Sequence, residues 1–362
     1  VLGRTLPHYE VRPQQARMMA LVAQAFNEQG IAVIEAPTGI GKTIAYLLPA
    51  AQWAIRNRER LVISTRTINL QEQIMQKDIP DLLPALEKPV RAVLVKGRGN
   101  YVCPRRLERA LAEATLFEDE GDQEQLKAIA EWARKTEDGT LSDLPFAPAR
   151  DIWEQVCSEA DTCQFTTCTN LKRCFVGKAR REIAKADLIV VNHHMLFADL
   201  AIKKEAGNFS SLAVLPAFRR VIFDEAHKLS KHVDGTETAR YRVGEALAQA
   251  VPVFLLLTAT PHQGDAGRFL HLLNLVDPYA FNQVEDLRPE EVSNVVWRTR
   301  KRAAASSMAS GSPSSRAQIA SMRAMSDAVG LPSLPVFAAR SAKSRPATDS
   351  IPALSLALME VV

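Results

Sequence analysis

The sequence lacks several features that mark membrane and secreted proteins. No stretch of the 362 residues approaches the roughly 18 apolar residues of a membrane-spanning helix, so we expect no membrane partner. The first residues, VLGRTLPHYE, lack the basic-then-apolar order of a signal peptide. We therefore expect a cytoplasmic protein.

Charge and cysteine are also limited. The net charge of +4 permits an anionic partner such as nucleic acid but does not require one. Only five cysteines occur, and four of them crowd into one segment, which is typical of a metal site rather than a disulfide framework. With 47% apolar and 24% charged residues, the chain is ordinary globular material, long enough for two or more domains.

What is present is organised around the stretch IAVIEAPTGIGKT, which spans residues 31–43. Its apolar start predicts a short buried strand, and two glycines then lead into a helix that begins near Lys42. Backbone N–H groups at such a turn point one way and suit a polyphosphate. Lys42 adds a charge for the terminal phosphates, and the Thr43 hydroxyl adds a ligand for Mg²⁺. We predict ATP and Mg²⁺ as cofactors, with nucleotide contacts from Ala36, Pro37, Thr38, Gly39, Ile40, Gly41, Lys42 and Thr43.

Helices and apolar strands alternate around this loop. Residues 12–26 carry apolar side chains at helical spacing, and Gln15 in this helix occupies a position that is typical of an adenine-reading glutamine. The alternation predicts an α/β, RecA-like P-loop domain with a parallel sheet that is covered on both faces. Further strands are predicted at residues 61–64, 92–96, 188–192, 221–224 and 254–257.

The stretch VIFDEAH places two carboxylates directly after an apolar strand, at the edge where open α/β sheets bind ligands. Asp224 can hold Mg²⁺ through water, and Glu225 can deprotonate the water that attacks the γ-phosphate. Lys42, Asp224 and Glu225 are the predicted catalytic residues. His227 is predicted to contact the nucleotide and to relay to Thr258 at the end of the next strand.

Residues 99–175 interrupt the α/β pattern with a segment that is mostly helical, including an acidic stretch at 113–135. Three of its cysteines have the spacing C-x₄-C-x₅-C, and Cys103 lies about sixty residues earlier. Four thiolates can close a tetrahedral zinc site or hold an iron–sulfur cluster, and the spacing does not choose between the metals. Cys157 is left over and is predicted to be a spare thiol. The predicted metal ligands are Cys103, Cys163, Cys168 and Cys174.

The predicted organisation has four parts. Residues 1–98 and 176–300 form the two parts of one RecA-like domain, and residues 99–175 form the inserted domain. Residues 301–362 are rich in Ala, Ser, Met and Arg, without a sustained apolar period, and are predicted to be a disordered tail. This tail has three alternative interpretations: a basic arm that contacts DNA, a linker, or the product of a shifted reading frame.

The order R-P-x-Q, A-P-T-G-I-G-K-T, Y-V-C-P, C-x₄-C-x₅-C, V-V-N-H-H and D-E-A-H resembles the DinG/XPD family of superfamily 2 DNA helicases over about residues 9–230. The resemblance implies ATP-dependent 5′ to 3′ unwinding and a [4Fe-4S] cluster on the four cysteines. It implies single-stranded DNA, or DNA with a single-stranded tail, as the partner. Asn192 and His193 match a family motif whose role the residue chemistry does not explain. Protein partners are not indicated.

From about residue 221 to 300 the sequence instead resembles Swi/Snf DNA translocases, with T-A-T-P leading into a helix and a D-P turn. Nothing after Ala280 resembles a second RecA-like domain, which in superfamily 2 motors supplies an arginine for phosphoryl transfer. We therefore expect this chain alone to hydrolyse ATP near background. A non-catalytic ATP- and DNA-binding module and a truncated or chimeric Swi/Snf-like translocase are the alternative interpretations.

Residues that could face DNA are basic or aromatic. Thr65 and Arg66 follow the second strand, at the position where the family contacts the DNA backbone, and Tyr101 and Phe175 are candidates for base stacking. Basic residues flank both ends of the inserted segment and could contact phosphates. They are Lys96, Arg98, Arg105, Arg106 and Arg109 at the first end, and Lys172, Arg173, Lys178, Arg180 and Arg181 at the second.

Overall fold

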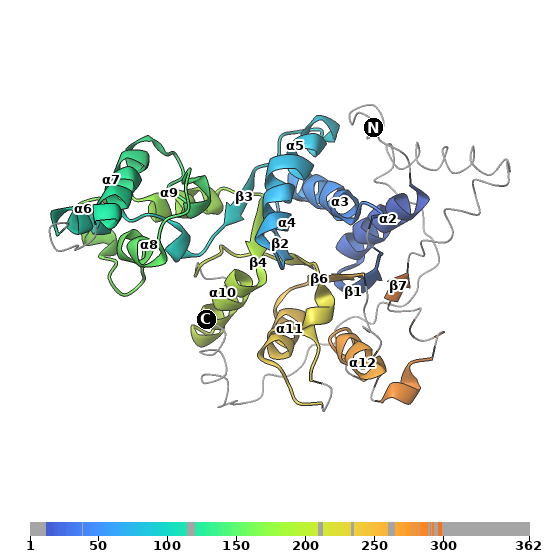
Figure 1. Ribbon diagram of the computed structural model, residues 1–362. Helices are drawn as coiled ribbons and strands as arrows, with labels where there is room; N and C mark the ends of the chain where they lie inside the picture. Colours follow the sequence, from blue (N-terminus) through green and yellow to red (C-terminus); the bar gives the residue numbers. More distant parts are fainter. Residues whose placement is uncertain are drawn as a thin grey trace.

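The computed structural model describes residues 12–298 except 38, 114–119, 209–212, 233–234, 260–264, 278, 282, 289, 291 and 293–295. The predicted tail at 301–362 lies outside the described residues, as does the predicted nucleotide contact Thr38. A seven-stranded parallel sheet forms the centre (Figure 1), in the order β3-β4-β2-β5-β6-β1-β7. The strands are β1 Gly30–Glu35, β2 Leu61–Thr65, β3 Ala92–Val95, β4 Leu188–Asn192, β5 Arg220–Phe223, β6 Val253–Thr258 and β7 Val296–Arg298.

The central strands are continuous runs of β-branched and other apolar residues. All five residues of β2 and all six of β6 are buried, as expected where helices cover both faces of a parallel sheet. β1 pairs with β6 in parallel, with Gly30 opposite Val253 and Glu35 opposite Thr258. The predicted α/β class and the six predicted strands are confirmed.

The seventh strand was not predicted. β7 is three residues long and pairs with the outer edge of β1, with Val33 opposite Val296. Three residues are too few to show the alternation of apolar and polar residues that predicts a strand. β7 forms because the edge of β1 offers backbone hydrogen-bonding groups, not because of its own sequence.

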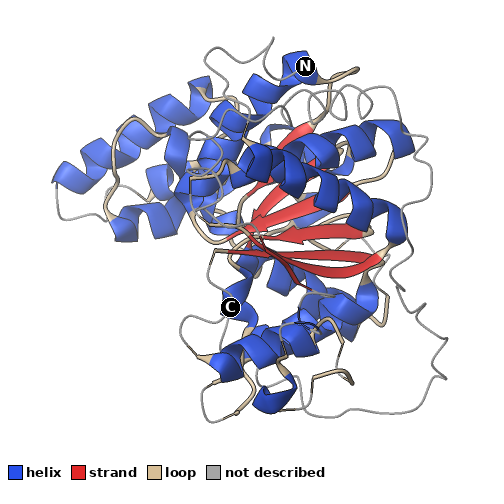
Figure 2. Ribbon diagram, turned by 90° about the vertical axis from the view of Figure 1, so that its right-hand side faces the viewer, coloured by secondary structure: helices blue, strands red, loops and turns tan. Residues whose placement is uncertain are grey.

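Helices cover both faces of the sheet (Figure 2). One face packs against α2 Pro13–Glu28, α3 Lys42–Asn57, α4 Ile68–Gln73 and α5 Ile79–Leu82 through one hydrophobic core. The opposite face packs against α10 His193–Glu205, α11 Ala239–Ala250 and α12 Ala266–Asn274 through a second core. Because side chains alternate along each strand, neighbouring residues such as Val62 and Ile63 belong to different cores.

The inserted segment leaves the sheet after its edge strand β3 and returns through α9 to β4, lying to one side of the sheet (Figure 1). Its own small core includes Leu107, Ile129 and Ile152 from three different helices. The expected acidic helix is α7, and residues 114–119 before it lie outside the described part. The helices are α6 Pro104–Ala112, α7 Glu120–Lys135, α8 Arg150–Val156 and α9 Phe175–Ala184.

Single helical turns connect these elements. One is a π-helical turn at Ile74–Asp78, which continues α4 into α5. Of the helices in the described residues, none is long and apolar enough to cross a membrane. The 3₁₀ turns are Leu83–Ala85, Arg98–Asn100, Leu141–Asp143, Phe165–Thr167, Leu171–Arg173, Ala226–Leu229 and Val284–Asp286.

Candidate nucleotide site and cysteine loop

The P-loop follows β1 and is fixed to the neighbouring strand. The Ala36 N–H donates to the Thr258 carbonyl at 2.9 Å. Gly39 and Gly41 have φ angles of +83° and +80°, which glycine adopts without a steric cost, and Lys42 is the first residue of α3. The strand, loop and helix are therefore arranged as the sequence predicts, with the start of α3 facing the loop.

Two side chains brace this loop from the start of α2. The Gln15 amide donates to the Gly41 carbonyl at 3.0 Å, and Arg12 donates to the Gly39 carbonyl at 2.8 Å. A Cβ on Gly41 would lie 2.2 Å from Gln15 Nε2, so a larger residue would displace this amide, and the positive φ already favours glycine. Gln15 thus has a visible part in holding the loop, and adenine reading by its side chain stays a prediction.

Asp224 lies directly after β5, at the same edge of the sheet. Its N–H donates to the Ser64 carbonyl at 2.9 Å, and only 4% of the residue is exposed. Burial raises the pKa of the Asp224 carboxyl, and the positive charge of Lys42 acts in the opposite direction. Lys42 and Asp224 lie at the same edge of the sheet, because they follow β1 and β5, which both pair in parallel with β6.

Glu225 has a left-handed backbone with φ of +60°, which is uncommon for a residue other than glycine. Its carboxylate lies 3.4 Å from His227 Nε2, and His227 Nδ1 lies 3.2 Å from the Thr258 hydroxyl. Burial lowers the pKa of His227, although the Glu225 carboxylate opposes the shift. A chain of contacts thus runs from Glu225 through His227 to the end of β6.

Tyr46 and His193 are site residues that the sequence did not single out by role. Tyr46 is fully buried on α3, three residues after Thr43. Burial raises the pKa of its phenol, the charge of Asp224 adds to the shift, and the Thr43 hydroxyl opposes it. Its position one helical turn after Thr43 was a readable signal. Burial lowers the pKa of His193 to about 3, with Arg240 adding to the effect and the Asp224 backbone opposing it.

The four predicted metal ligands are half-buried, and none forms a disulfide. Cys103 and Cys174 cap the starts of α6 and α9, and the Gly177 N–H donates to Cys174 Sγ at 3.4 Å. Helix starts favour thiolates, so this donor set suits an iron–sulfur cluster chemically. Among the residues that the structure describes, however, no three His, Cys, Asp or Glu side chains form a group close enough to hold a metal ion.

Cys157 differs from these four cysteines. It is 6% exposed within the core of the inserted segment, burial raises the pKa of its thiol, and Sγ contacts the Glu154 carbonyl at 3.7 Å. The structure thus places the leftover cysteine apart, as a packed core residue.

Three arginines predicted to face DNA have partners at the end of α8 or in the cysteine loop, residues 158–174, and their contact with DNA stays a prediction. Arg106 donates to the Gln155 carbonyl at 3.0 Å and the Glu154 carbonyl at 2.5 Å, and it pairs with Glu159. Arg105 donates to the Thr162 carbonyl, and Arg98 donates to the Glu159 carbonyl at 3.1 Å and lies 4.0 Å from Cys163 Sγ. Arg180 lies near the thiols of Cys163 and Cys174, which favour its charged form against the effect of burial.

Tyr101 and Lys96 are also engaged inside the inserted segment. Tyr101 is only 6% exposed, so its predicted role in base stacking is wrong: the ring is packed against protein and offers no open face. Lys96 donates to the Ser142 hydroxyl, and burial lowers the pKa of its ammonium group.

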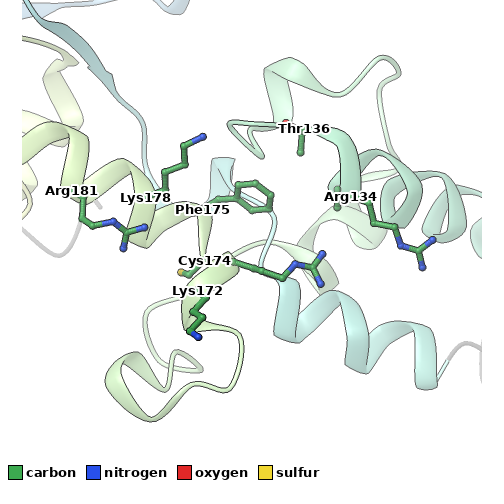
Figure 3. A pocket seen from close by; sticks show the side chains of 9 residues that line it. Arg134, Thr136, Lys172, Cys174, Phe175, Lys178 and Arg181 are labelled. Carbon is green, nitrogen blue, oxygen red and sulfur yellow. The ribbon is translucent and has the colours of Figure 1, made fainter.

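The second basic group has a different arrangement. A cavity of about 250 Å³ lies between the end of α7 and the start of α9, and Figure 3 shows the Phe175 ring between Lys178 and Arg134 in this view. Phe175 also packs flat against Gly139, whose φ is +63° and whose absent Cβ would lie 2.3 Å from the ring. The other cavity residues are Ala133, Thr136, Lys172, Arg173, Cys174 and Arg181.

Comparisons with known proteins agree with this geometry. The chain is 37% identical to the ATP-dependent DNA helicase YoaA of Haemophilus influenzae, over 63% of this chain and 34% of that protein. It is 33% identical to the ATP-dependent helicase DinG of Mycobacterium tuberculosis, over 63% of this chain and 36% of that one. The chain thus spans about a third of the length of the curated relatives it matches.

A solved structure of the Sulfolobus solfataricus SWI2/SNF2 ATPase core in complex with double-stranded DNA aligns with a TM-score of 0.40 and 10% identity, over 80% of this chain and 44% of that one. The sequence model of the DEAD/DEAH box helicase family matches residues 12–95 and 122–268, which is more than half of the chain. The predicted resemblance to DinG-type helicases is confirmed by the named relatives. The chain therefore belongs to the DEAD/DEAH box helicase family.

Proposed function

We propose that this chain is the nucleotide-binding part of an ATP-dependent DNA helicase of DinG type. The observation that carries the proposal is that the P-loop and the buried Asp224 lie at one edge of the sheet, after two strands that both pair with β6. Thr43 and Asp224 would hold Mg²⁺, which neutralises charge on the phosphates when it is bound. Glu225 stands next to Asp224 and is the base that would orient the attacking water.

Two regions supply the DNA contacts that we propose: the end of β2 in the sheet and the cavity in the inserted segment. Arg66 is exposed directly after β2, and the basic cavity around Phe175 offers cations for phosphates and an aromatic ring for a base. Single-stranded DNA, or DNA with a single-stranded tail, is the proposed partner, with 5′ to 3′ movement driven by ATP in the cytoplasm. Relatives named as an ATP-dependent DNA helicase and as an ATP-dependent helicase support this assignment.

For the inserted segment we propose a [4Fe-4S] cluster on Cys103, Cys163, Cys168 and Cys174. The free thiols, the two helix starts and the nearby guanidinium groups of Arg98 and Arg180 support this ligand set. We further propose that residues 99–175 form this cluster domain and that 1–98 with 176–300 form one motor domain.

Binding measurements on the purified 362-residue chain test the proposal. Titration with a fluorescent ATP analogue should show binding that requires Mg²⁺ and is lost with EDTA. Fluorescence anisotropy with oligo(dT) should show binding that weakens steeply as salt rises. Binding releases cations from the DNA, and this release is less favourable at high salt concentration. A chain that binds neither ligand at low salt would contradict the proposed function.

A further inference from the structure

His193 lies where the nucleotide-facing and DNA-facing parts of the sheet edge meet. It is the first residue of α10 and follows directly after β4, and the Asn192 side chain caps this helix by accepting from the Met195 N–H at 2.7 Å. The capped start fixes the backbone of His193 beside the end of β2. The ring is 8% exposed and therefore belongs to the packed interior.

Two contacts tie this ring to two different strands. His193 Nδ1 lies 2.7 Å from the Ser64 hydroxyl in β2. On its face, the ring stacks on Phe223 of β5, with centroids 3.9 Å apart and planes 7° from parallel. Ser64 and Phe223 are opposite each other in the β2–β5 pair, so the imidazole contacts the last paired residues of both strands.

The residues that follow Ser64 and Phe223 are those proposed to bind DNA and Mg²⁺. After Ser64 come the buried Thr65, whose hydroxyl has no hydrogen-bond partner in the part of the chain that the structure describes, and the exposed Arg66. After Phe223 comes Asp224, whose N–H donates to the Ser64 carbonyl. His193 thus contacts the residue before the proposed DNA-binding residues on β2 and the residue before the proposed Mg²⁺ ligand on β5.

The His193 ring can transmit a displacement of β2 to β5. Packed interiors have few voids, so a shift of Ser64 toward a bound strand either moves the ring against Phe223 or breaks the hydrogen bond. Such contacts respond by changing between discrete arrangements rather than by bending continuously. The hydrogen bond to Ser64 fixes the orientation of the His193 ring, and the stack on Phe223 fills the space between the two strands.

We propose that His193 is a positioning residue that couples DNA binding at the end of β2 to Mg²⁺–nucleotide binding at Asp224. This inference rests on the proposed function, because it requires both ligands. Coupling of this kind is reciprocal, so DNA must strengthen nucleotide binding by the same factor by which nucleotide strengthens DNA binding.

The test compares nucleotide affinity in the absence and presence of saturating oligo(dT), with Mg²⁺ and the fluorescent analogue mant-AMPPNP on the full chain. We expect DNA to tighten nucleotide binding of the unmodified chain by about fivefold or more. His193→Phe keeps a flat ring against Phe223 but removes the hydrogen bond to Ser64, so the ratio of the two affinities should fall toward one. His193→Asn restores a hydrogen-bonding group near the Nδ1 position and should recover part of the ratio.

His194→Phe is the matched control, since His194 is the exposed neighbour on the same helix, and it should keep the ratio of the unmodified chain. If His193→Phe does not fold, as judged by circular dichroism, Ser64→Ala removes the same hydrogen bond from the other side and should lower the ratio equally. A folded His193→Phe or Ser64→Ala variant with an unchanged ratio would overturn the inference. So would an unmodified chain that binds both ligands with a ratio of one, whereas a chain that binds neither ligand refutes the proposed function itself and this inference with it.

Discussion

Asp224 and Cys163 are held in place by different means. Asp224 follows β5, which is buried between two hydrophobic cores, and its N–H donates a hydrogen bond to the Ser64 carbonyl of the neighbouring strand β2. Cys163 lies in a half-exposed loop that arginine side chains anchor through its carbonyl groups. The sheet therefore fixes its reactive group before any ligand binds, whereas the cysteine loop lies outside the small core of the inserted segment and would gain folding free energy from a bound metal group.

The largest expected effect breaks the pre-formed site without disturbing the sheet. Lys42→Ala removes the cation that faces Asp224 and should abolish Mg²⁺–ATP binding. Contacts between charged groups contribute about 1.5–3 kcal/mol each, so losing two phosphate contacts weakens binding by about 100-fold or more. Titration with a fluorescent ATP analogue measures this loss.

Lys88→Ala is the control, because Lys88 carries the same charge on an exposed surface, and it should leave the nucleotide affinity unchanged. Glu225→Gln should keep nucleotide binding and remove the hydrolysis that is present, because the amide cannot accept the proton of the attacking water. Full nucleotide affinity in the Lys42 variant would contradict the P-loop assignment.

The second change tests the other side of the comparison. Protein purified without oxygen should contain about four irons per chain and be brown. Cys168→Ser should lose the iron and the colour and should loosen the inserted segment, as measured by iron assay and limited proteolysis. Nucleotide affinity should not change, because Lys42 and Asp224 lie at the edge of the sheet and outside the inserted segment.

Cys157→Ser should keep the iron, since this thiol lies in the hydrophobic core of the segment rather than in the loop. Stoichiometric zinc without iron in the unmodified protein would refute the iron–sulfur proposal and leave a zinc site in its place.

A third change probes how the sheet region uses polar groups inside its core. Lys203 and Asp199 of α10 form an ion pair at 2.7 Å, with exposed side-chain fractions of 1% and 0%. Asp199 also accepts from the N–H groups of Val214 and Leu215, at 2.9 Å and 2.7 Å. Lys203→Ala leaves a buried carboxylate without its partner and should lower the free energy of unfolding by about 3–5 kcal/mol.

Thermal or urea unfolding gives this difference. Lys204→Ala changes the exposed neighbour on the same helix and should stay within about 0.5 kcal/mol of the unmodified chain. Equal stability of the two variants would show that the buried pair contributes nothing beyond a surface lysine.

The smallest expected effect concerns the anchoring of the cysteine loop. Arg106→Ala removes the hydrogen bonds to the Gln155 and Glu154 carbonyls of α8 and the ion pair with Glu159 in the loop, and it should destabilise the inserted segment by about 1–3 kcal/mol. Hydrogen exchange of residues 157–174 should speed up. Arg109→Ala removes only the pair with Glu113 on an arginine side chain that is 73% exposed, so exchange in this control should not change.

Local features of the nucleotide site could be predicted from the sequence. The start of α3 at Lys42 follows from an apolar run and a glycine turn, and the place of Asp224 after β5 follows from the apolar run before it. Contacts between distant segments could not be predicted. Ser64 and His193 are 129 positions apart, and nothing around either residue indicates the other.

The arginines of the inserted segment show a second limit. Arg98 and Arg106 look the same in the sequence whether they contact phosphates or backbone carbonyls, because a guanidinium group bonds either acceptor. β7 shows a third limit, since three residues carry no period and the partner strand alone selects them. The order of elements was thus readable, while the side-chain partners required the folded chain.

The pairing of β1 with β6 also has a consequence for biosynthesis. Gly30 pairs with Val253, and the Ala36 N–H donates to the Thr258 carbonyl, so most of the described chain lies between these partners. A ribosome must release residue 258 from its tunnel before the P-loop can take its final place, whereas α6, α7 and α8 need only near neighbours. We expect the helical insertion to fold during translation, well before the emerging chain acquires any affinity for ATP.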